Sequence, residues 1–339
     1  MMEIRENVPL ASLVTFRTGG VARYLIGIRT DEDVVRAKKF ADEKGLPIGI
    51  LGGGSNTLPK DGVIKRVILR MEGDRIHFEE KSDAVFVIAD AGLSFDGVVA
   101  ETALRGYWGL ENLSGIPGSV GAAPVQNVGA YGVEAGNFID SVEVVDLETG
   151  RIRHLLHDEL RFGYRDSIFK HEEGNDLVVL RVTFRIPLGG GATIGYKDLA
   201  LHFGDKTPET PEEVRRAVIV IRSRKFPPLE SFGTAGSFFK NPIVPEDKAA
   251  DLLVRFPGMP QFPEKDGRVK LSAAFLIDKV AQLRGVREGD VETWQAQALV
   301  LVNRGGASSL EINAFAAMVA EHVHDKTGIM LEPEVVTLT

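Results

Sequence analysis

Residues 109–132 read GLENLSGIPGSVGAAPVQNVGAYG, and this stretch decides how the rest of the chain can be arranged. It contains six glycines, two prolines and a single charged residue, Glu111. A helix would not form here, because each interior glycine costs about 1 kcal/mol relative to alanine and proline removes a backbone donor. The stretch does not alternate like a strand, and it is too apolar for a solvated linker. We therefore expect an ordered loop, which serves either as a tight buried connection or as a cradle of N–H groups for a ligand.

Length, charge and cysteine content limit the class of protein. The chain has 339 residues, which is longer than a single hydrophobic core usually supports, so we expect two or three domains. A net charge of −8 argues against a nucleic-acid binder, since phosphate contacts need a basic surface, and an anionic ligand would need a local basic pocket. The absence of cysteine excludes disulfides and cysteine-ligated metals. The N-terminus lacks a signal segment and no apolar run reaches about 18 residues, so we expect a cytoplasmic protein without membrane association.

Hydrophobic periodicity divides the remaining chain into strands and helices. A strand at 23–28, a helix at 31–44 and a strand at 47–51 form a βαβ unit. Further strands are expected at 63–71, 84–90, 142–147, 176–186, 298–302 and 329–338, and further helices at 95–104, 211–225, 246–255, 271–283 and 309–326. Three consecutive glycines at 189–191 indicate a domain boundary nearby.

A second glycine-rich loop, GGGSN at residues 52–56, directly follows the predicted strand 47–51. Ligands of α/β folds bind at this end of a strand, and successive N–H groups there can surround a phosphate. The loop is no dinucleotide fingerprint, because the G-x-G-x-x-G frame fails at Thr57, and it is no P-loop, because no Gly-Lys-Ser/Thr follows. A phosphate would thus be held by loop amides rather than by a helix dipole, and a simple turn is the alternative.

Charged side chains gather at two other places. The helix at 211–225 ends in cations, among them Arg222 and Lys225, which either offset the helix dipole or bind an anion. In the last predicted strand, Glu332 and Glu334 fall on one face by the period of two. Two carboxylates there indicate either a functional pair or an edge strand with one solvated face.

Residues 233–242, GTAGSFFKNP, place a serine, a lysine and an asparagine on one glycine-flexed turn. The Ser237 hydroxyl, the Lys240 ammonium and the Asn241 amide could converge on one ligand. Serine-nucleophile chemistry lacks support, because no Gly-x-Ser-x-Gly elbow surrounds Ser237. The seven histidines are scattered and we expect no metal site.

Five of these segments occur in the same order in one known family. They are GGGSN at 52–56, IPG at 116–118 continuing to QNVGAYG at 126–132, YRDS at 164–167, AGSFFKNP at 235–242 and LEPEV at 331–335. Together they resemble the UDP-N-acetylenolpyruvoylglucosamine reductases, flavoenzymes of bacterial cell-wall precursor synthesis, over essentially the whole chain. Residues 164–169, with Tyr196 beyond them, resemble the longer subtype that folds a tyrosine loop over the substrate. Departures at Arg17, Thr18 and Pro59 lie near the expected cofactor and not among the proposed catalytic groups.

The resemblance implies an α+β fold with a two-subdomain FAD-binding domain of the PCMH/VAO type and a smaller α+β substrate-binding domain. Residues 1–72 and 73–190 would form the two FAD-binding subdomains, 191–326 the UDP-sugar domain, and 327–339 a strand that returns to the flavin. FAD would be bound non-covalently. By resemblance the FAD pyrophosphate lies against Gly52, Gly53, Gly54, Ser55 and Asn56, and the rest of the cofactor lies along Ile116, Gly118, Ser119 and Gly129.

The family's reaction implies roles for three residues. NADPH reduces the flavin, and flavin N5 then delivers hydride to C3 of the enolpyruvyl ether of UDP-N-acetylglucosamine while a proton is added at C2, which yields UDP-N-acetylmuramate. Arg165 matches the arginine that stabilises the negative charge of the intermediate, and its planar fork suits a carboxylate. Glu334 matches the family glutamate, which would act protonated or through a hydrogen bond. Ser237 matches the proton donor to C2, with Lys240 as a candidate to support its oxyanion.

The resemblance also implies the substrate contacts. They are Tyr196, Arg222, Lys225, Asn241 and Gln297. With no second nucleotide motif, NADPH should use the same pocket as the UDP-sugar, in a ping-pong sequence. We expect a monomer without nucleic-acid or membrane partners. The alternatives are another flavin oxidoreductase of the same cofactor fold with a different substrate, and a non-catalytic UDP-sugar-binding protein. Ser237 and Glu334 discriminate, because a generic oxidase would not need both.

Overall fold

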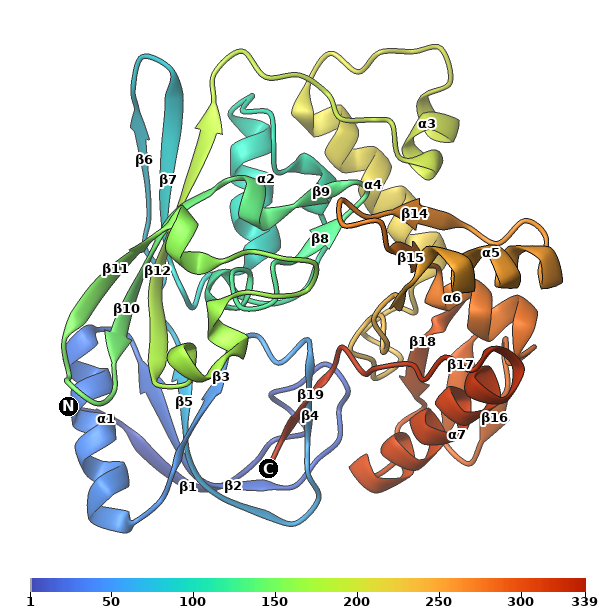
Figure 1. Ribbon diagram of the computed structural model, residues 1–339. Helices are drawn as coiled ribbons and strands as arrows, with labels where there is room; N and C mark the ends of the chain where they lie inside the picture. Colours follow the sequence, from blue (N-terminus) through green and yellow to red (C-terminus); the bar gives the residue numbers. More distant parts are fainter. Residues whose placement is uncertain (1) are drawn as a thin grey trace. The chain divides into compact units, whose positions relative to one another are not determined.

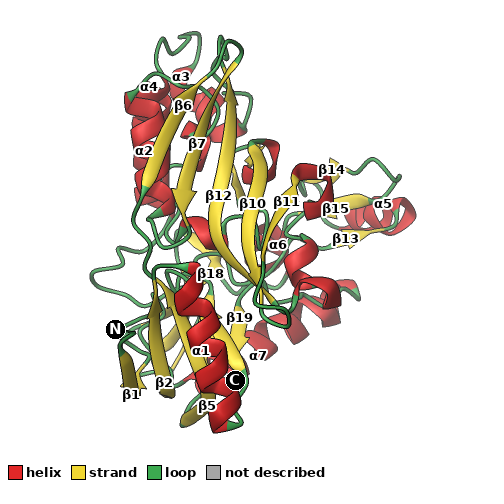
Figure 2. Cartoon of the chain, turned by 90° about the vertical axis from the view of Figure 1, so that its left-hand side faces the viewer, coloured by secondary structure: helices red, strands yellow, loops and turns green. Residues whose placement is uncertain are grey.

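The βαβ pattern near the N-terminus folds as a four-stranded sheet with one helix along it. The computed structural model describes residues 2–339, and the strands of this sheet follow the order β1-β2-β5-β3. Their bounds are β1 (Ile4–Pro9), β2 (Val21–Ile28), β3 (Ile48–Leu51) and β5 (Val63–Met71). β3 runs parallel to β5, and Figure 2 shows α1 (Asp31–Lys44) lying along this sheet.

Helix α1 begins and ends at its local signals. The Thr30 hydroxyl accepts a hydrogen bond from the Asp33 N–H, and the Asp33 carboxylate accepts one from the Thr30 N–H, which forms a capping box. Gly45, at φ 63°, ends the helix in the left-handed region. The buried face consists of Val34, Ala37 and Ala41. The predicted helix at 31–44 is therefore confirmed.

A five-stranded antiparallel sheet follows in the order β11-β10-β12-β7-β6. Its strands are β6 (Ile76–Glu80), β7 (Ala84–Asp90), β10 (Ile139–Asp146), β11 (Ile152–Leu156) and β12 (Leu177–Pro187). Helix α2 (Phe95–Leu104) lies beside this sheet (Figure 1), with the Phe95 and Phe184 ring centroids 6.3 Å apart. Both side chains are buried, so α2 shares the apolar core of the sheet.

The glycine-rich stretch 109–132 is an ordered loop, as its composition predicts. It contains only single turns and a short ladder, which are η1 (Glu111–Leu113), η2 (Val120–Ala122), β8 (Gly129–Ala130) and, just after it, β9 (Val133–Glu134) and η3 (Ala135–Asn137). Leu110, Leu113 and Val120 of this loop are fully buried. Three further single turns, η4 (His157–Leu160), η5 (Ile168–Lys170) and η6 (Glu172–Gly174), lie between β11 and β12.

Two helices after the second sheet share a small core of their own. Helices α3 (Lys197–Phe203) and α4 (Pro211–Lys225) bury their apolar sides together with Tyr131 of the glycine-rich loop. The predicted bounds of α4 are confirmed. Its last turn thereby lies against the loop that carries Tyr131.

The C-terminal third contains short sheets and three helices. These elements are β13 (Ile243–Val244), α5 (Glu246–Arg255), β14 (Gln261–Pro263), β15 (Val269–Leu271), α6 (Ala273–Phe275), η7 (Leu276–Val280), β16 (Arg287–Glu288), β17 (Val291–Trp294), β18 (Gln297–Asn303) and α7 (Ser309–Thr327). Helix α7 packs on β17 and β18 through an apolar cluster that includes Phe315 and Leu301. The last strand, β19 (Val336–Leu338), pairs in parallel with β4 (Thr57–Pro59).

The chain forms two compact units that each contain several sequence segments. The first comprises residues 1–8, 22–54 and 65–223, and the second comprises 9–21, 55–64 and 224–339. These limits do not follow the four predicted domain ranges, because α3 and most of α4 belong to the first unit through their packing on Tyr131. Assigning FAD and UDP-sugar functions to the four ranges remains a prediction.

Two predicted elements are shorter than expected. The helix predicted at 271–283 is one α-helical turn followed by a π-helical turn, and Gln282, at φ 58°, prevents its continuation. The strand predicted at 329–338 is limited to β19, because the residues before it bridge to Phe239 instead of extending the same ladder. Glu332 and Glu334 thus lie in an irregular segment. Edge strands such as β6 and β11 were missed because most of their side chains are exposed.

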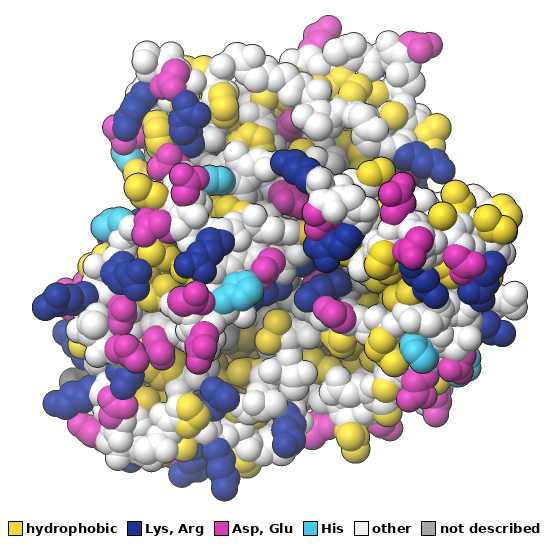
Figure 3. Space-filling model, in the orientation of Figure 1, with side chains coloured by type: hydrophobic (Ala, Val, Ile, Leu, Met, Phe, Trp, Pro, Cys, Tyr) yellow, Lys and Arg dark blue, Asp and Glu magenta, His cyan; other side chains and the backbone are white. Residues whose placement is uncertain are grey.

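None of the helices within residues 2–339 is long and apolar enough to cross a membrane. On the face drawn in Figure 3, Lys and Arg side chains are interspersed with Asp and Glu. An anion-binding site on this face would therefore consist of a local group of side chains and backbone amides.

Candidate active site

In the first unit, the two glycine-rich loops meet at van der Waals distance. A Cβ atom on Gly53 would lie 2.7 Å from the Gly118 Cα, and one on Gly52 would lie 2.5 Å from the Ser119 Oγ. The contact with the Gly118 backbone leaves no room for a side chain at 53, so this approach requires glycine there, whereas the Ser119 hydroxyl near Gly52 could rotate away. The loop after β3 and the loop at 116–119 therefore form one backbone surface, as a shared cofactor site requires.

This surface suits an oxygen-rich ligand such as a pyrophosphate. The Ser119 Oγ is buried and has no hydrogen-bond partner among the described residues. A buried hydroxyl without a partner is costly, so its donor and acceptor are suited to a ligand. The residues thus fit FAD by their chemistry, and the placement of the diphosphate against Gly52 to Asn56 and of the rest of the cofactor along Ile116, Gly118, Ser119 and Gly129 stays a prediction.

Arg165 lies at the tip of a tight hairpin closed by backbone hydrogen bonds between Gly163 and Asp166. Its φ of 53° is in the left-handed region, and the Lys170 ammonium donates to the Arg165 carbonyl over 2.6 Å. The guanidinium donates to the Gly129 carbonyl over 3.0 Å. The structure thus brings together Arg165 and Gly129, two predicted site residues from separate motifs.

Asn127 holds that hairpin in place, and it was not among the predicted site residues. Its side-chain amide donates to the Glu134 carboxylate (2.8 Å) and to the Gly163 carbonyl (2.9 Å) and accepts from the Gly136 N–H (2.8 Å). Its backbone carbonyl accepts a longer bond from Arg165, at 3.4 Å. Because Asn127 is buried, it fixes the loop that carries Arg165.

Two tyrosines and a partly buried arginine form a second cluster in the same unit. The Tyr131 and Tyr196 rings meet edge to face with centroids 5.4 Å apart, and Tyr196 is 41% exposed. Burial raises the pKa of Tyr131 to about 12, although the nearby Arg222 guanidinium, which hydrogen-bonds to its hydroxyl, opposes this. Burial also lowers the pKa of Arg222. Tyr131 was missed, although it lies in the quoted QNVGAYG motif.

In the second unit, Ser237 and Glu334 lie on adjoining segments. Ser237 bridges to Val300 of β18, and the next residue, Phe238, accepts a hydrogen bond at its carbonyl from the Glu334 N–H over 2.7 Å. Both side chains are partly exposed. Two predicted catalytic residues almost a hundred positions apart are thereby neighbours along paired backbone. Lys240 lies 3.4 Å from Glu332, in an ion pair.

The Glu334 segment is also tied to the end of the GGGSN loop. The Asn56 side chain donates to the Glu334 carbonyl over 3.0 Å, and the Val336 N–H donates to the Asn56 carbonyl over 3.0 Å.

Two predicted substrate contacts lie elsewhere in the second unit. The Asn241 side-chain oxygen accepts from the Ala273 N–H at the start of α6 (2.9 Å). Gln297 begins β18.

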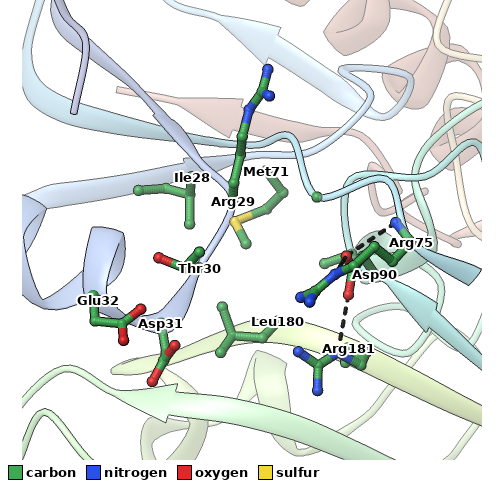
Figure 4. A pocket seen from close by; sticks show the side chains of 12 residues that line it. Ile28, Arg29, Thr30, Asp31, Glu32, Met71, Arg75, Asp90, Leu180 and Arg181 are labelled. Carbon is green, nitrogen blue, oxygen red and sulfur yellow. Dashed lines mark hydrogen bonds and ion pairs between the residues drawn. The ribbon is translucent and has the colours of Figure 1, made fainter. Parts of the chain in front are cut away.

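A cavity of about 200 Å³ in the first unit lies apart from these residues. Figure 4 shows it beside the start of α1, with Arg75 and Arg181 directed at Asp90. Asp90 receives hydrogen bonds from Arg75 (2.9 Å) and Arg181 (3.0 Å). None of the predicted site residues lines this cavity, and the buried Asp90 carboxylate beside it is already paired with the two arginines.

The predicted site residues thus divide between the two units. The first unit holds Gly52, Gly53, Gly54, Ile116, Gly118, Ser119, Gly129, Arg165, Tyr196 and Arg222, and the second holds Ser55, Asn56, Lys225, Ser237, Asn241, Gln297 and Glu334. Each unit brings its own motifs together. The meeting of Arg165 with Ser237 and Glu334 stays a prediction.

The α+β fold and its two apposed glycine loops indicate an FAD-binding oxidoreductase. Residues 22–156 match the sequence pattern of the family described as "FAD binding domain". Residues 227–338 match that of the C-terminal domain of UDP-N-acetylenolpyruvoylglucosamine reductase. FAD is therefore the cofactor, and the α+β fold expected from the motifs is confirmed.

Individual proteins agree with these domain matches. The chain is 45% identical to the UDP-N-acetylenolpyruvoylglucosamine reductase of Chromobacterium violaceum and 41% identical to that of Pseudomonas aeruginosa, over 98% of both chains in each case. The crystal structure of the Thermus caldophilus enzyme superposes with a TM-score of 0.69 at 27% identity, covering all of both chains. The chain belongs to the UDP-N-acetylenolpyruvoylglucosamine reductase family.

Proposed function

We propose that this protein reduces UDP-N-acetylglucosamine enolpyruvate to UDP-N-acetylmuramate at the expense of NADPH. One observation carries the proposal beyond family membership: the Ser237 segment is hydrogen-bonded directly to the Glu334 segment. A proton donor and a second acid on adjoining backbone are what this reaction needs and what a generic flavin oxidase does not.

The chemical difficulty of the reaction is the charge that it creates. FAD, once bound and reduced by NADPH, would supply the hydride that is added to C3 of the enolpyruvyl group. Negative charge then develops at C2 and spreads into the substrate carboxylate. The protein must hold donors at that carboxylate and a proton source at C2.

Arg165 is suited to the carboxylate. Its hairpin is braced by Asn127 and Lys170, so the guanidinium is held before the substrate arrives. Donors that are fixed in advance cost no reorganisation when the charge develops. Its planar fork can bind a carboxylate through two parallel hydrogen bonds.

Ser237 is assigned as the proton donor to C2, and Glu334 as the acid that hydrogen-bonds to the developing charge. A hydroxyl is a weak acid, so the assignment includes the backbone hydrogen bond that joins the segment of Ser237 to that of Glu334. Acid catalysis of this kind contributes roughly 10²–10⁴-fold to the rate. Glu334 would act as a donor, because a bare carboxylate would repel the intermediate.

The UDP portion is assigned to a mixed aromatic and cationic set, namely Tyr196, Arg222, Lys225, Asn241 and Gln297. Tyr196 is exposed enough to pack on a ligand, and the partly buried Arg222 lies beside Tyr131, whose ring contacts Tyr196. We propose that NADPH uses the same pocket in a ping-pong sequence, and that the enzyme acts as a cytoplasmic monomer without nucleic-acid or membrane partners.

An anaerobic half-reaction experiment tests the proposal. The purified protein is reduced with NADPH until the visible flavin absorbance is bleached, and UDP-N-acetylglucosamine enolpyruvate is then added. We expect the absorbance to return with formation of UDP-N-acetylmuramate. Bleaching by NADPH without recovery would instead indicate a flavin oxidoreductase with another substrate, and a protein that binds no flavin would contradict the enzyme assignment.

A further inference from the structure

A charged pair outside the predicted site, Asp96 and Arg215, holds the backbone of the residue that precedes the predicted cofactor loop. Asp96, in the first turn of α2, forms two hydrogen bonds with the Arg215 guanidinium of α4, one of them 2.9 Å long. The same carboxylate accepts a hydrogen bond from the Gly115 N–H over 2.5 Å. Gly115 directly precedes Ile116, Pro117, Gly118 and Ser119.

The carbonyl of Gly115, which belongs to the next peptide unit, is held by a substrate-site candidate. The Arg222 Nε donates to the Gly115 carbonyl over 3.1 Å. A Cβ on Gly115 would lie 2.8 Å from the Ile219 side chain, and its φ of 69° is in the left-handed region, so glycine is required here. Asp96, Gly115 and Arg222 are therefore one connected network.

Burial makes this network stronger than a surface ion pair. The Arg215 side chain is 19% exposed and that of Asp96 is 30% exposed. Burial alone would raise the pKa of Asp96, but hydrogen bonds from Arg215 and Gly115 and the charges of Arg215 and Arg222 hold it below its ordinary value. The carboxylate thus stays ionised and keeps all its acceptors for these partners.

We propose that Asp96 and Arg215 are positioning residues that fix the Gly115 peptide and, through it, both the FAD loop at 116–119 and the Arg222 guanidinium. This inference rests on the proposed placement of FAD at that loop. Asp96 acts on the loop through the Gly115 N–H, while Arg215 orients the Asp96 carboxylate by its bidentate fork. Neither residue needs to touch FAD or substrate.

The test compares FAD affinity and steady-state constants of the full-length enzyme. In Asp96→Ala and Arg215→Ala we expect the FAD dissociation constant, from the change in flavin fluorescence on titration, to rise about tenfold, since a lost charge-assisted hydrogen bond has this magnitude. KM for the UDP-sugar should rise more than kcat falls, because Arg222 loses its anchor. Asp96→Asn keeps an acceptor for Gly115, so it should fold and show a smaller loss.

We refer to the hydrogen bond from the Gly115 N–H to Asp96, with Arg215 orienting that carboxylate, as the clamp. A charge-swapped double variant, Asp96→Arg with Arg215→Asp, distinguishes the clamp from an ordinary ion pair between α2 and α4. It can restore the salt bridge, but it places a guanidinium, which has no acceptor, at the Gly115 N–H. The clamp predicts no recovery of FAD affinity, whereas a purely structural ion pair predicts recovery. Asp83→Ala, which removes the exposed pair between Asp83 and Arg185, should leave FAD affinity unchanged.

Gly53→Val distinguishes the clamp from the placement of FAD. Its side chain would collide with Gly118, so FAD affinity should fall strongly if the cofactor lies there. If Gly53→Val loses FAD while Asp96→Ala, Asp96→Asn and Arg215→Ala keep the wild-type dissociation constant, the clamp is wrong and the placement stands. If Gly53→Val keeps FAD, the placement is wrong and the clamp is overturned with it.

Discussion

Asn127→Asp should weaken both the fold of the first unit and the step that uses Arg165. The wild-type amide donates to the Glu134 carboxylate and to the Gly163 carbonyl at 2.8 and 2.9 Å. An ionised aspartate has the same shape but no donor, so both acceptors would face a negative oxygen. A buried polar group that loses its partner costs about 1–3 kcal/mol, so two such groups lower the free energy of unfolding by about 2–6 kcal/mol.

Thermal unfolding and stopped-flow spectroscopy measure the two effects of Asn127→Asp. For a unit of this size 1 kcal/mol corresponds to about 2–4 °C, so Tm should fall by about 4 °C or more. Release of the hairpin should slow reoxidation of the reduced flavin by the enolpyruvyl substrate by about 10²–10³-fold, the cost of losing one fixed donor to developing charge. Reduction of the flavin by NADPH should stay near the wild-type rate.

Asn112→Asp is the matched control for this prediction. Asn112 is also fully buried, in the same unit, and its amide donates to the carbonyls of Tyr131 (2.9 Å) and Thr193 (2.7 Å). It should lower Tm by a similar amount but leave the rate of reoxidation at saturating substrate near wild type. Reoxidation of Asn127→Asp at the wild-type rate, despite its lower Tm, would refute the reasoning that Asn127 holds Arg165 in place.

Three further outcomes are expected. Ser237→Ala should leave NADPH reduction of the flavin intact and slow its reoxidation by about 10²–10⁴-fold in stopped-flow traces; reoxidation at the wild-type rate would exclude Ser237 as the proton donor. Burial would raise the pKa of Asp90, but hydrogen bonds from Arg75 and Arg181 lower it overall, so its stabilisation is complete above about pH 4 and is lost as the pH falls further. Urea unfolding should show this loss in the wild type and a weaker pH dependence in Asp90→Asn. Thr30→Ala, which removes the cap of α1, should lower the free energy of unfolding by about 1 kcal/mol without changing FAD affinity; an unchanged urea midpoint would contradict the capping box.

Local signals made much of the secondary structure predictable. The bounds of α1, α2, α4 and α5 agree with the helices expected from apolar spacing, capping residues and proline. Apolar periodicity predicted the wrong bounds where contacts with distant segments determine the backbone conformation. An example is the segment at 329–338, whose backbone hydrogen bonds go to Phe238 and Asn56. Short exposed strands have no apolar face, so no period marks them.

The motifs named candidate site residues, but they gave no indication of the groups that support those residues in the structure. Residues 109–132 could be recognised as an ordered loop because six glycines and two prolines exclude helix and strand on local grounds alone. Asp96 and Arg215 gave no such signal, since they are 119 positions apart and each is an ordinary charged residue on a helix.

The sequence by itself determined that this chain carries two glycine loops, capped amphipathic helices and the motif residues Arg165, Ser237 and Glu334, because spacing, composition and capping act over a few residues. Only the tertiary structure decided that Asn127 braces the Arg165 hairpin, that Phe238 pairs with Glu334 and that Asp96 and Arg215 grip Gly115. Such pairings depend on which distant segments bury their apolar faces together, and each buried polar group is then satisfied by whichever partner the packing brings within reach.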